Sequence, residues 1–202
     1  KMVLLRGLGP LLQGIANVLA DPKLELHGPS GFATVTNDNW MDAPNKQAII
    51  DTGLPPTNNN ESAILVTLDP GLYTAILSGA DGGSGVGLVE VYDLTPNASK
   101  LANISTRAFV GTGNDIVIAG FILSNSTAQG RVVVRGIGPS LGSTGVANPL
   151  ADPMLQIRDM NGAIVGGNND WMDFPPDASQ LTALGLAPTN NLESGIIKPL
   201  AP

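Results

Sequence analysis

The segment from Leu19 to Ser62 occurs twice in this chain in related form, and no other feature of the sequence constrains the fold as strongly. Its two copies lie 131 or 132 residues apart, and an upstream Arg-Gly motif recurs at a spacing of 129. Self-similarity of this kind indicates two modules built on one plan. The matching segments are Arg6-Gly7-Leu8-Gly9-Pro10 with Arg135-Gly136-Ile137-Gly138-Pro139, Leu19-Ala20-Asp21-Pro22 with Leu150-Ala151-Asp152-Pro153, residues 37–42 with 168–173, and residues 53–62 with 185–194.

Composition limits the classes of protein to which this chain of 202 residues can belong. The net charge of −7, with only 10 lysines and arginines, argues against a nucleic-acid-binding surface. No cysteine is present and His27 is the only histidine, so disulfides, thiolate chemistry and the usual zinc sites are excluded. The longest apolar run, from Ile116 to Leu123, is too short to cross a bilayer.

The surface and the turns also follow from composition. Charged residues make up 13% of the chain and aromatic residues 4%, so the core must be aliphatic and the surface rich in Asn, Thr, Ser and Gly. Such a surface suits an extracellular or self-associating protein. The 25 glycines and 16 prolines are spread along the chain, which favours many turns between short strands.

Short runs of apolar or alternating residues predict β-strands. Residues 3–7 and their copy at 132–136 are aliphatic up to a terminal glycine, which is typical of a buried strand. Residues 23–27 and 154–158 alternate, so they should form half-buried strands, each followed by a turn and a partner strand.

Two further hairpins are expected from turn residues. Asp69-Pro70-Gly71 joins the apolar runs 63–68 and 72–77, and residues 111–115 join the runs 104–110 and 116–123. The run 116–123 is apolar on both faces, so it should lie centrally in a sheet or be covered by a neighbouring subunit.

Strands at regular spacing with turn signals between them predict an all-β fold of tandem antiparallel β-sandwich modules, immunoglobulin-like or jelly-roll-like in kind. At most one short helix per repeat is expected, over 45–51 in the first copy and 177–184 in the second. The sequence holds no long amphipathic helix, which argues against a βαβ fold.

The repeat also sets the expected domain boundaries. Residues 1–95 form a first module that lacks its opening hairpin, residues 96–103 a linker, and residues 104–202 a second module that lacks its closing hairpin. An incomplete sandwich exposes strand edges that another chain can extend. Either the chain is a fragment of a longer repeat array, or its subunits complete each other in a polymer.

Candidate metal ligands occur in the duplicated Trp loops. These loops offer hard oxygen atoms in a short span, which calcium prefers, but they lack the order of an EF-hand. Calcium is therefore a hypothesis, and no cofactor is required. The alternative is that Asn and Asp side chains cap turns while the Trp fills the core. The candidate ligands are Asn37, Asp38, Asn39, Asp42, Asn168, Asn169, Asp170 and Asp173.

We find no catalytic constellation in the sequence and expect no enzyme activity. Glu61 and Glu193 occupy equivalent places in the two repeats, which indicates a buried or capping carboxylate in each rather than the paired acids of a glycosidase. Arg6 ends an apolar strand, and we expect it to pair with a carboxylate such as Asp21 or with turn carbonyls, as its copy would with Asp152.

The repeated motifs, together with residues 85–94, resemble the tandem β-sandwich repeat modules of large secreted or surface proteins of environmental bacteria such as Verrucomicrobia. The resemblance covers nearly the whole chain. It implies an extracellular or cell-surface repeat protein, and it supplies no catalytic residue.

The expected function is that of a structural subunit in an extracellular filament or surface repeat array, assembled by β-strand edge pairing and apolar packing between modules. Its partners would be other copies of the chain or neighbouring repeats of the same chain, with no nucleic acid and no membrane span. The alternative is a carbohydrate-binding or adhesion module that holds glycans on Trp40, Trp171 or Tyr73, although the apolar surroundings of these residues favour core packing.

Overall fold

The computed structural model describes residues 1–95, 103–113, 115–123 and 130–200. The chain divides into two compact units, unit 1 from Lys1 to Ile104 and unit 2 from Ser105 to Pro202. Most of the expected linker, residues 96–102, lies outside the described residues, so that boundary stays a prediction.

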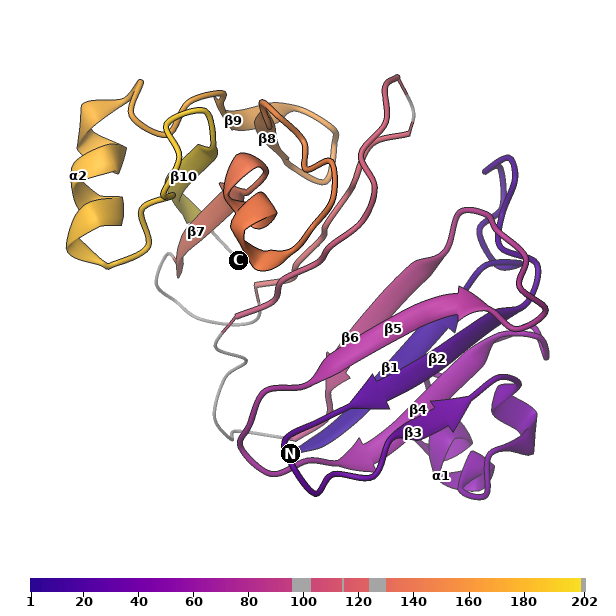
Figure 1. Cartoon of the computed structure of the whole chain (residues 1–202). Helices are drawn as coiled ribbons and strands as arrows, with labels where there is room; N and C mark the ends of the chain where they lie inside the picture. The colour runs from indigo at the N-terminus through magenta and orange to yellow at the C-terminus, as the bar shows by residue number, and fades with distance from the viewer. Residues whose placement is uncertain (96–102, 114, 124–129, 201–202) are drawn as a thin grey trace. The chain divides into compact units, whose positions relative to one another are not determined.

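Unit 1 is built from two antiparallel sheets and two short helices (Figure 1). One sheet has the strand order β4-β1-β6 and the other the order β3-β2-β5. The strands are β1 (Met2–Leu8), β2 (Pro22–His27), β3 (Val35–Asn37), β4 (Ser62–Thr67), β5 (Thr74–Gly79) and β6 (Leu88–Asp93), and the helices are the 3-10 helix η1 (Trp40–Asp42) and α1 (Lys46–Asp51).

Strand β1 is the centre of unit 1 because its side chains enter two cores. Val3 and Leu5 point into a cluster with Leu24 and Leu26 of β2, and this cluster joins the two sheets. Leu4 points the other way, into a second cluster with the helical residues Trp40 and Ile49. Burial on both faces explains why residues 3–5 of this strand are all aliphatic and do not alternate with polar residues.

Unit 2 repeats part of this plan. Its strands are β7 (Gly130–Gly136), β8 (Leu155–Arg158), β9 (Ile164–Asn168) and β10 (Ser194–Leu200), and its helices are η2 (Pro139–Thr144) and α2 (Pro175–Ala183). Strand β7 pairs with β10, and β8 pairs with β9, both antiparallel.

The registers of the two units agree residue by residue. Gly7 lies opposite Ser62 in unit 1, and Gly136 lies opposite Ser194 in unit 2. Likewise Leu24 faces Asn37, and their counterparts at 155 and 168 face each other. The sequence repeat is therefore also a repeat of strand pairing, with β7, β8, β9 and β10 in the places of β1, β2, β3 and β4.

The units differ in their last two strands. In unit 1, β6 pairs with β1 and β5 pairs with β2. Among the described residues of unit 2, β7 and β8 have no partner on the corresponding side. The consequence is visible in burial, because Leu4 and Leu5 are buried whereas their counterparts Val133 and Val134 are only half-buried.

The all-β expectation is confirmed at the level of several small antiparallel sheets with few helices. Each unit has one α-helix, and α2 begins at Pro175, two residues before the predicted start, since proline is favoured in the first helical turn. The two 3-10 helices were not predicted. No helix in the described ranges is long and apolar enough to cross a membrane.

One expected hairpin is wrong. The runs on either side of Asp69-Pro70-Gly71 form β4 and β5, but β4 pairs with β1 and β5 with β2, so this turn carries the chain from one sheet to the other. Turn residues specify that the chain reverses, but the partner of each strand is decided by the core that its apolar face can enter.

The apolar segment 104–123 also differs from expectation. Its turn forms, with Gly111 N–H donating to the Asp115 carbonyl at 2.6 Å, but none of its described residues is assigned to a strand. A two-stranded ribbon without a third strand or a packed face is marginal, which accounts for the missing ladder. We call residues 104–123 the apolar arm.

Candidate functional site

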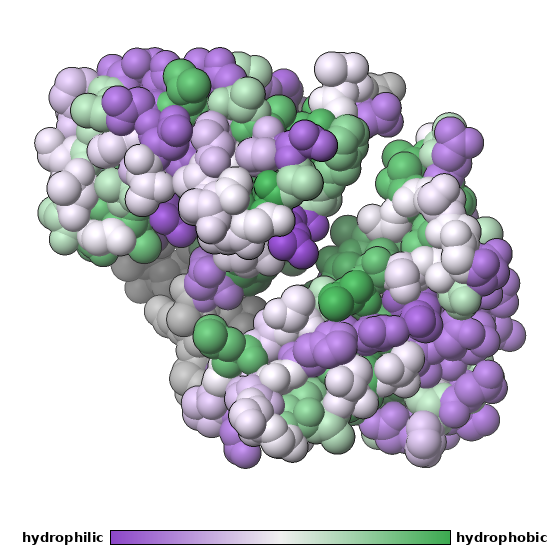
Figure 2. Space-filling model, viewed as in Figure 1, coloured by the Kyte–Doolittle hydropathy of each residue, from purple (hydrophilic) through white to green (hydrophobic). Residues whose placement is uncertain are grey.

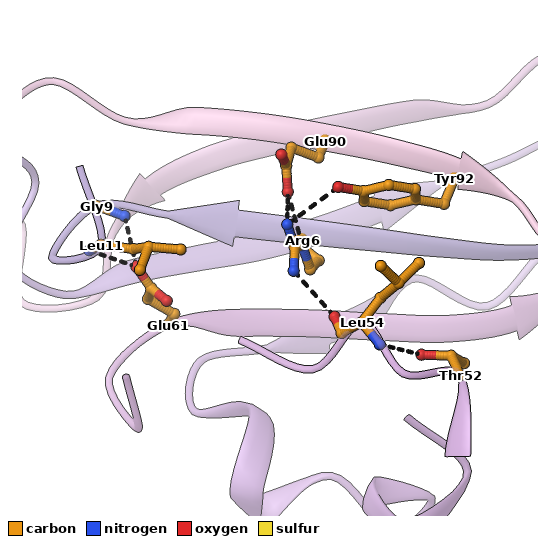
Figure 3. Close-up of polar contacts among 8 residues, drawn as sticks. All are labelled: Arg6, Gly9, Leu11, Thr52, Leu54, Glu61, Glu90 and Tyr92. Carbon is orange, nitrogen blue, oxygen red and sulfur yellow. Dashed lines mark hydrogen bonds and ion pairs between the residues drawn. The ribbon is translucent and has the colours of Figure 1, made fainter. Parts of the chain in front are cut away.

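A buried glutamate organises each copy of the repeat. Glu61 is 0% exposed, and its Oε1 accepts hydrogen bonds from the backbone N–H groups of Leu11, at 2.8 Å, and Gly9, at 3.3 Å (Figure 3). Glu193 does the same for Gly138, at 3.0 Å, and Ser140, at 2.9 Å. The expectation of a buried, capping carboxylate is confirmed, and the carboxylate ties the loop after the central strand to the start of β4 or β10.

The glycines of the Arg-Gly-x-Gly motif are required by close approach of the chain to itself. A Cβ atom on Gly9 would lie 1.9 Å from the carbonyl oxygen of Leu19, and one on Gly138 would lie 2.1 Å from that of Leu150. No side chain fits there unless the backbone moves. The fold itself therefore requires these glycines.

The hydrogen bonds around Glu193 affect its titration. Burial alone raises the pKa of this carboxyl, but hydrogen bonds from the Ser140 hydroxyl and from the backbone of Ser140, Gly138 and Asn190 outweigh burial. The net result is a pKa below the ordinary value, because each donor favours the ionised form.

Two of the eight candidate calcium ligands are engaged in the fold. Asn37 Oδ1 accepts from the N–H of Ala63 at 2.8 Å, and its Nδ2 donates to the carbonyl of Asn39 at 3.1 Å. Asn168 makes the same two contacts, with Gly195 N–H and the Asp170 carbonyl, both at 2.8 Å. These amides bridge the Trp loop to the neighbouring strand, as the turn-capping alternative predicts.

The carboxylates of the loops are brought near other acids. Burial, followed by the negative charges of Asp21 and Asp42, raises the pKa of Asp38, while Lys23 opposes them. In the second loop, burial, Asp173 and Asp152 raise the pKa of Asp170. One oxygen of Asp38 and one of Asp170 are buried without a hydrogen-bond partner in the described part of the chain.

A shallow pocket lies beside each loop. The pocket in unit 1 has a volume of about 560 Å³ and includes Asp38, Asn39 and Asp42 in its lining. The pocket in unit 2 has about 440 Å³ and includes Asn169 and Asp173. Within the described ranges, no three Asp, Glu, His or Cys side chains are arranged to hold a metal ion, and calcium stays a prediction.

The aromatic residues considered for sugar stacking are engaged in packing. Trp40 is 7% exposed, and its Nε1 donates to the Asn58 carbonyl at 3.1 Å. Tyr73 packs edge-on against Phe32 with ring centroids 5.4 Å apart. Trp171 is half-buried in unit 2. Trp40 and Tyr73 therefore present no open aromatic platform.

Arg6 binds a partner that sequence reasoning missed. Its Nε donates to Glu90 Oε2 at 2.6 Å, and its guanidinium also contacts the Tyr92 hydroxyl at 3.0 Å and the Leu54 carbonyl at 3.0 Å (Figure 3). The expected kinds of partner, a carboxylate and a turn carbonyl, are confirmed, but the choice of Asp21 as the carboxylate is wrong. The guanidinium also lies over the Tyr92 ring, 5.1 Å from its centroid.

The equivalent arginine of unit 2 is only partly satisfied. Arg135 donates to the carbonyl of Leu186 at 3.3 Å, which is the counterpart of the contact between Arg6 and Leu54. Among the described residues it forms no ion pair, and its side chain is exposed. The sequence contained a signal for this difference between the two arginines. The Arg-Gly motif occurs twice, but the Glu-x-Tyr motif of residues 90–92 occurs once.

The open edge of β7, with Arg135 on it, is thus the feature of the chain that most resembles a binding site. The loops around Glu61 and Glu193 are internal supports. No family model, no curated protein and no solved structure matches this chain.

Proposed function

We propose that this chain is a structural subunit of an extracellular bacterial filament or surface repeat array. Its modules would be tandem antiparallel β-sandwiches that associate by pairing edge strands and burying aliphatic surface, without catalysis. The observation that carries the proposal is an apolar surface of unit 2 that no described residue pairs with or covers, made up of the β7 edge and the apolar arm.

The apolar arm supports this proposal because its large side chains have nothing to cover them among the described residues. Phe109 is 91% exposed, Ile118 83% and Ile122 92%. Exposed apolar residues gathered on one segment mark a surface for association. A neighbouring module that covered the arm would supply the third strand that a two-stranded ribbon lacks.

Unit 1 offers a matching kind of surface. Strands β5 and β6 are edge strands of their sheets, and side chains such as Ile76, Val89 and Val91 are exposed on them. Figure 2 shows hydrophobic side chains on the visible face of unit 1 in the region of these strands. An edge with free backbone groups and apolar side chains is a template for a further strand.

The two cores of unit 1 support the sandwich reading of a module. Residues from β1 and β2, in different sheets, share one cluster, as the two inner faces of a sandwich do. Glu61 and Glu193 are buried, and each accepts backbone hydrogen bonds from the loop after its central strand, which suits a rigid building block.

Electron microscopy and light scattering across a range of concentrations test the proposal. We expect ordered filaments or chains whose axial repeat matches one or two modules. The paired substitutions Ile118→Lys and Ile122→Lys should abolish them, while Met160→Lys, a residue 98% exposed outside the arm, should leave them unchanged. Monomers at every concentration would contradict the proposal.

A further inference from the structure

We propose that the open edge of β7 is an acceptor for an antiparallel strand of the β6 type, supplied by a further copy of the repeat. The donor places a glutamate opposite Arg135 and a tyrosine two residues further along. This inference deepens the proposed function and rests on it for the source of the donor strand.

The register of the incoming strand follows from unit 1. There Arg6 lies opposite Glu90, Leu4 opposite Tyr92 and Leu8 opposite Leu88. Since β7 occupies the place of β1, the same pairing sets a Glu-x-Tyr strand against Arg135 and Val133. Every position on β7 that this pairing uses has the same character as its counterpart on β1.

The guanidinium of Arg135 is positioned to bind the carboxylate of the donor strand. The Leu186 carbonyl binds Arg135 from the loop after α2, just as the Leu54 carbonyl binds Arg6 after α1. In unit 1 the remaining donors of Arg6 go to Glu90 and Tyr92. In unit 2 those two positions are unfilled by any described residue, so the charge of the edge is complementary to a Glu-x-Tyr strand.

The donor is a pair of strands, because β8 is open in the same way. In unit 1, β5 pairs with β2, and Leu77 Cδ1 lies 2.7 Å from the place that a Cβ atom on Gly7 would take. At the equivalent glycine, Gly136, the three nearest atoms to such a Cβ belong to Ser194 and Leu155, with no counterpart of Leu77 among them. A β5–β6-type pair of consecutive strands therefore satisfies both open edges, with backbone hydrogen bonds giving affinity and the Arg-Glu contact setting the register.

A synthetic peptide of residues 69–95, which spans β5 and β6, tests this acceptor in the intact chain. The labelled peptide is titrated into the full chain at a concentration below that of any assembly, and binding is followed by fluorescence anisotropy. We expect saturable binding with one peptide per chain. Arg135→Glu should weaken it by roughly tenfold or more, because it places two carboxylates together.

Two controls keep the result specific. Lys198→Glu reverses a charge on β10, the strand on the side of β7 that is already paired, and it should leave binding unchanged. A peptide with Glu90→Arg should bind the Arg135→Glu chain better than the wild-type peptide does, because the charges are exchanged. This rescue also shows that the Arg135→Glu chain is folded.

The outcomes separate the acceptor from the filament. No saturable binding, or binding insensitive to Arg135→Glu, would overturn the acceptor even if filaments form. Binding with the expected charge dependence in a chain that never assembles would uphold the acceptor and remove the filament proposal.

Discussion

Arg6 and Glu90 form an ion pair across β1 and β6, with a hydrogen bond of 2.6 Å from Nε to Oε2. It joins the central strand of unit 1 to the last strand of that sheet. Arg135 stands at the equivalent position on β7, and the described residues of unit 2 supply no equivalent of Glu90. The contrast makes unit 1 a template for what unit 2 can bind.

The first prediction compares the two arginines. Arg6→Ala should lower the free energy of unfolding by about 2–4 kcal/mol, because it leaves Glu90 and two further groups without their partner in a half-buried site. Arg135→Ala should lower it by less than about 1 kcal/mol, since the residue is exposed. Urea unfolding of both variants measures the difference, and equal losses would contradict the contrast between the paired Arg6 and an Arg135 that is unpaired among the described residues.

The second prediction concerns the glycines of the repeat. Gly138→Ala should destabilise the chain by about 2–3 kcal/mol or prevent folding, because the added Cβ meets the Leu150 carbonyl. Gly120→Ala is a matched control, since a Cβ there meets nothing within 4 Å. The Tm values of the two variants distinguish a steric clash at Gly138 from a general destabilisation by any Gly→Ala substitution.

The third prediction is a pH dependence set by Glu193. Its folded pKa lies below the ordinary value of 4.5, so the ionised group adds stability that is fully present above that value. The contribution is lost as the pH falls through the folded pKa. Glu193→Gln should therefore be less stable than wild type by about 1–3 kcal/mol at pH 7, with the gap closing below pH 4.5. A gap that does not change with pH would refute this assignment.

The fourth prediction concerns Asp38, whose ionisation should lower the stability of the fold, whereas that of Glu193 raises it. The folded pKa of Asp38 is raised, so stability falls as the pH rises from 3.8 through the folded pKa. Asp38→Asn, which installs the residue found at the equivalent position 169, should stabilise the chain by up to about 1 kcal/mol at pH 7 and have no effect at pH 3. Chemical unfolding at the two pH values checks it.

The same pair of proteins tests the calcium hypothesis. If the Trp loops bind calcium through Asp38, calcium at roughly millimolar concentration should raise the Tm of wild type more than that of Asp38→Asn. A Tm that does not respond to calcium in either protein would remove the hypothesis and leave the turn-capping role of these side chains.

Much of the local structure could be predicted from the sequence, because it depends on neighbours in the chain. The alternation at residues 23–27 predicted β2, and the hairpin to β3 followed from the turn between them. The repeat predicted that Glu61 and Glu193 share one role, and the two hydrogen-bond sets agree.

Long-range pairing could not be predicted in the same way. The partner of Arg6 is 84 residues away, and a nearer carboxylate at Asp21 fitted the local pattern equally well. The turn at Asp69-Pro70-Gly71 carried no information on which sheet each flanking strand would join. The partner of each strand depends on which core its apolar side chains can enter, and the residues that form each core are set by the whole fold.

The central claim is that β7 accepts a β6-type strand in the register of unit 1. Site-directed disulfide formation tests this claim most directly. The chain has no cysteine, so Val133→Cys introduces a unique thiol at the position equivalent to Leu4, which faces Tyr92 in unit 1. A peptide of residues 69–95 with Tyr92→Cys should form a disulfide with this chain under mild oxidation. The Val132→Cys chain should form little, because its side chain points to the other face of the strand. Equal cross-linking of both chains, or none, would contradict the claim.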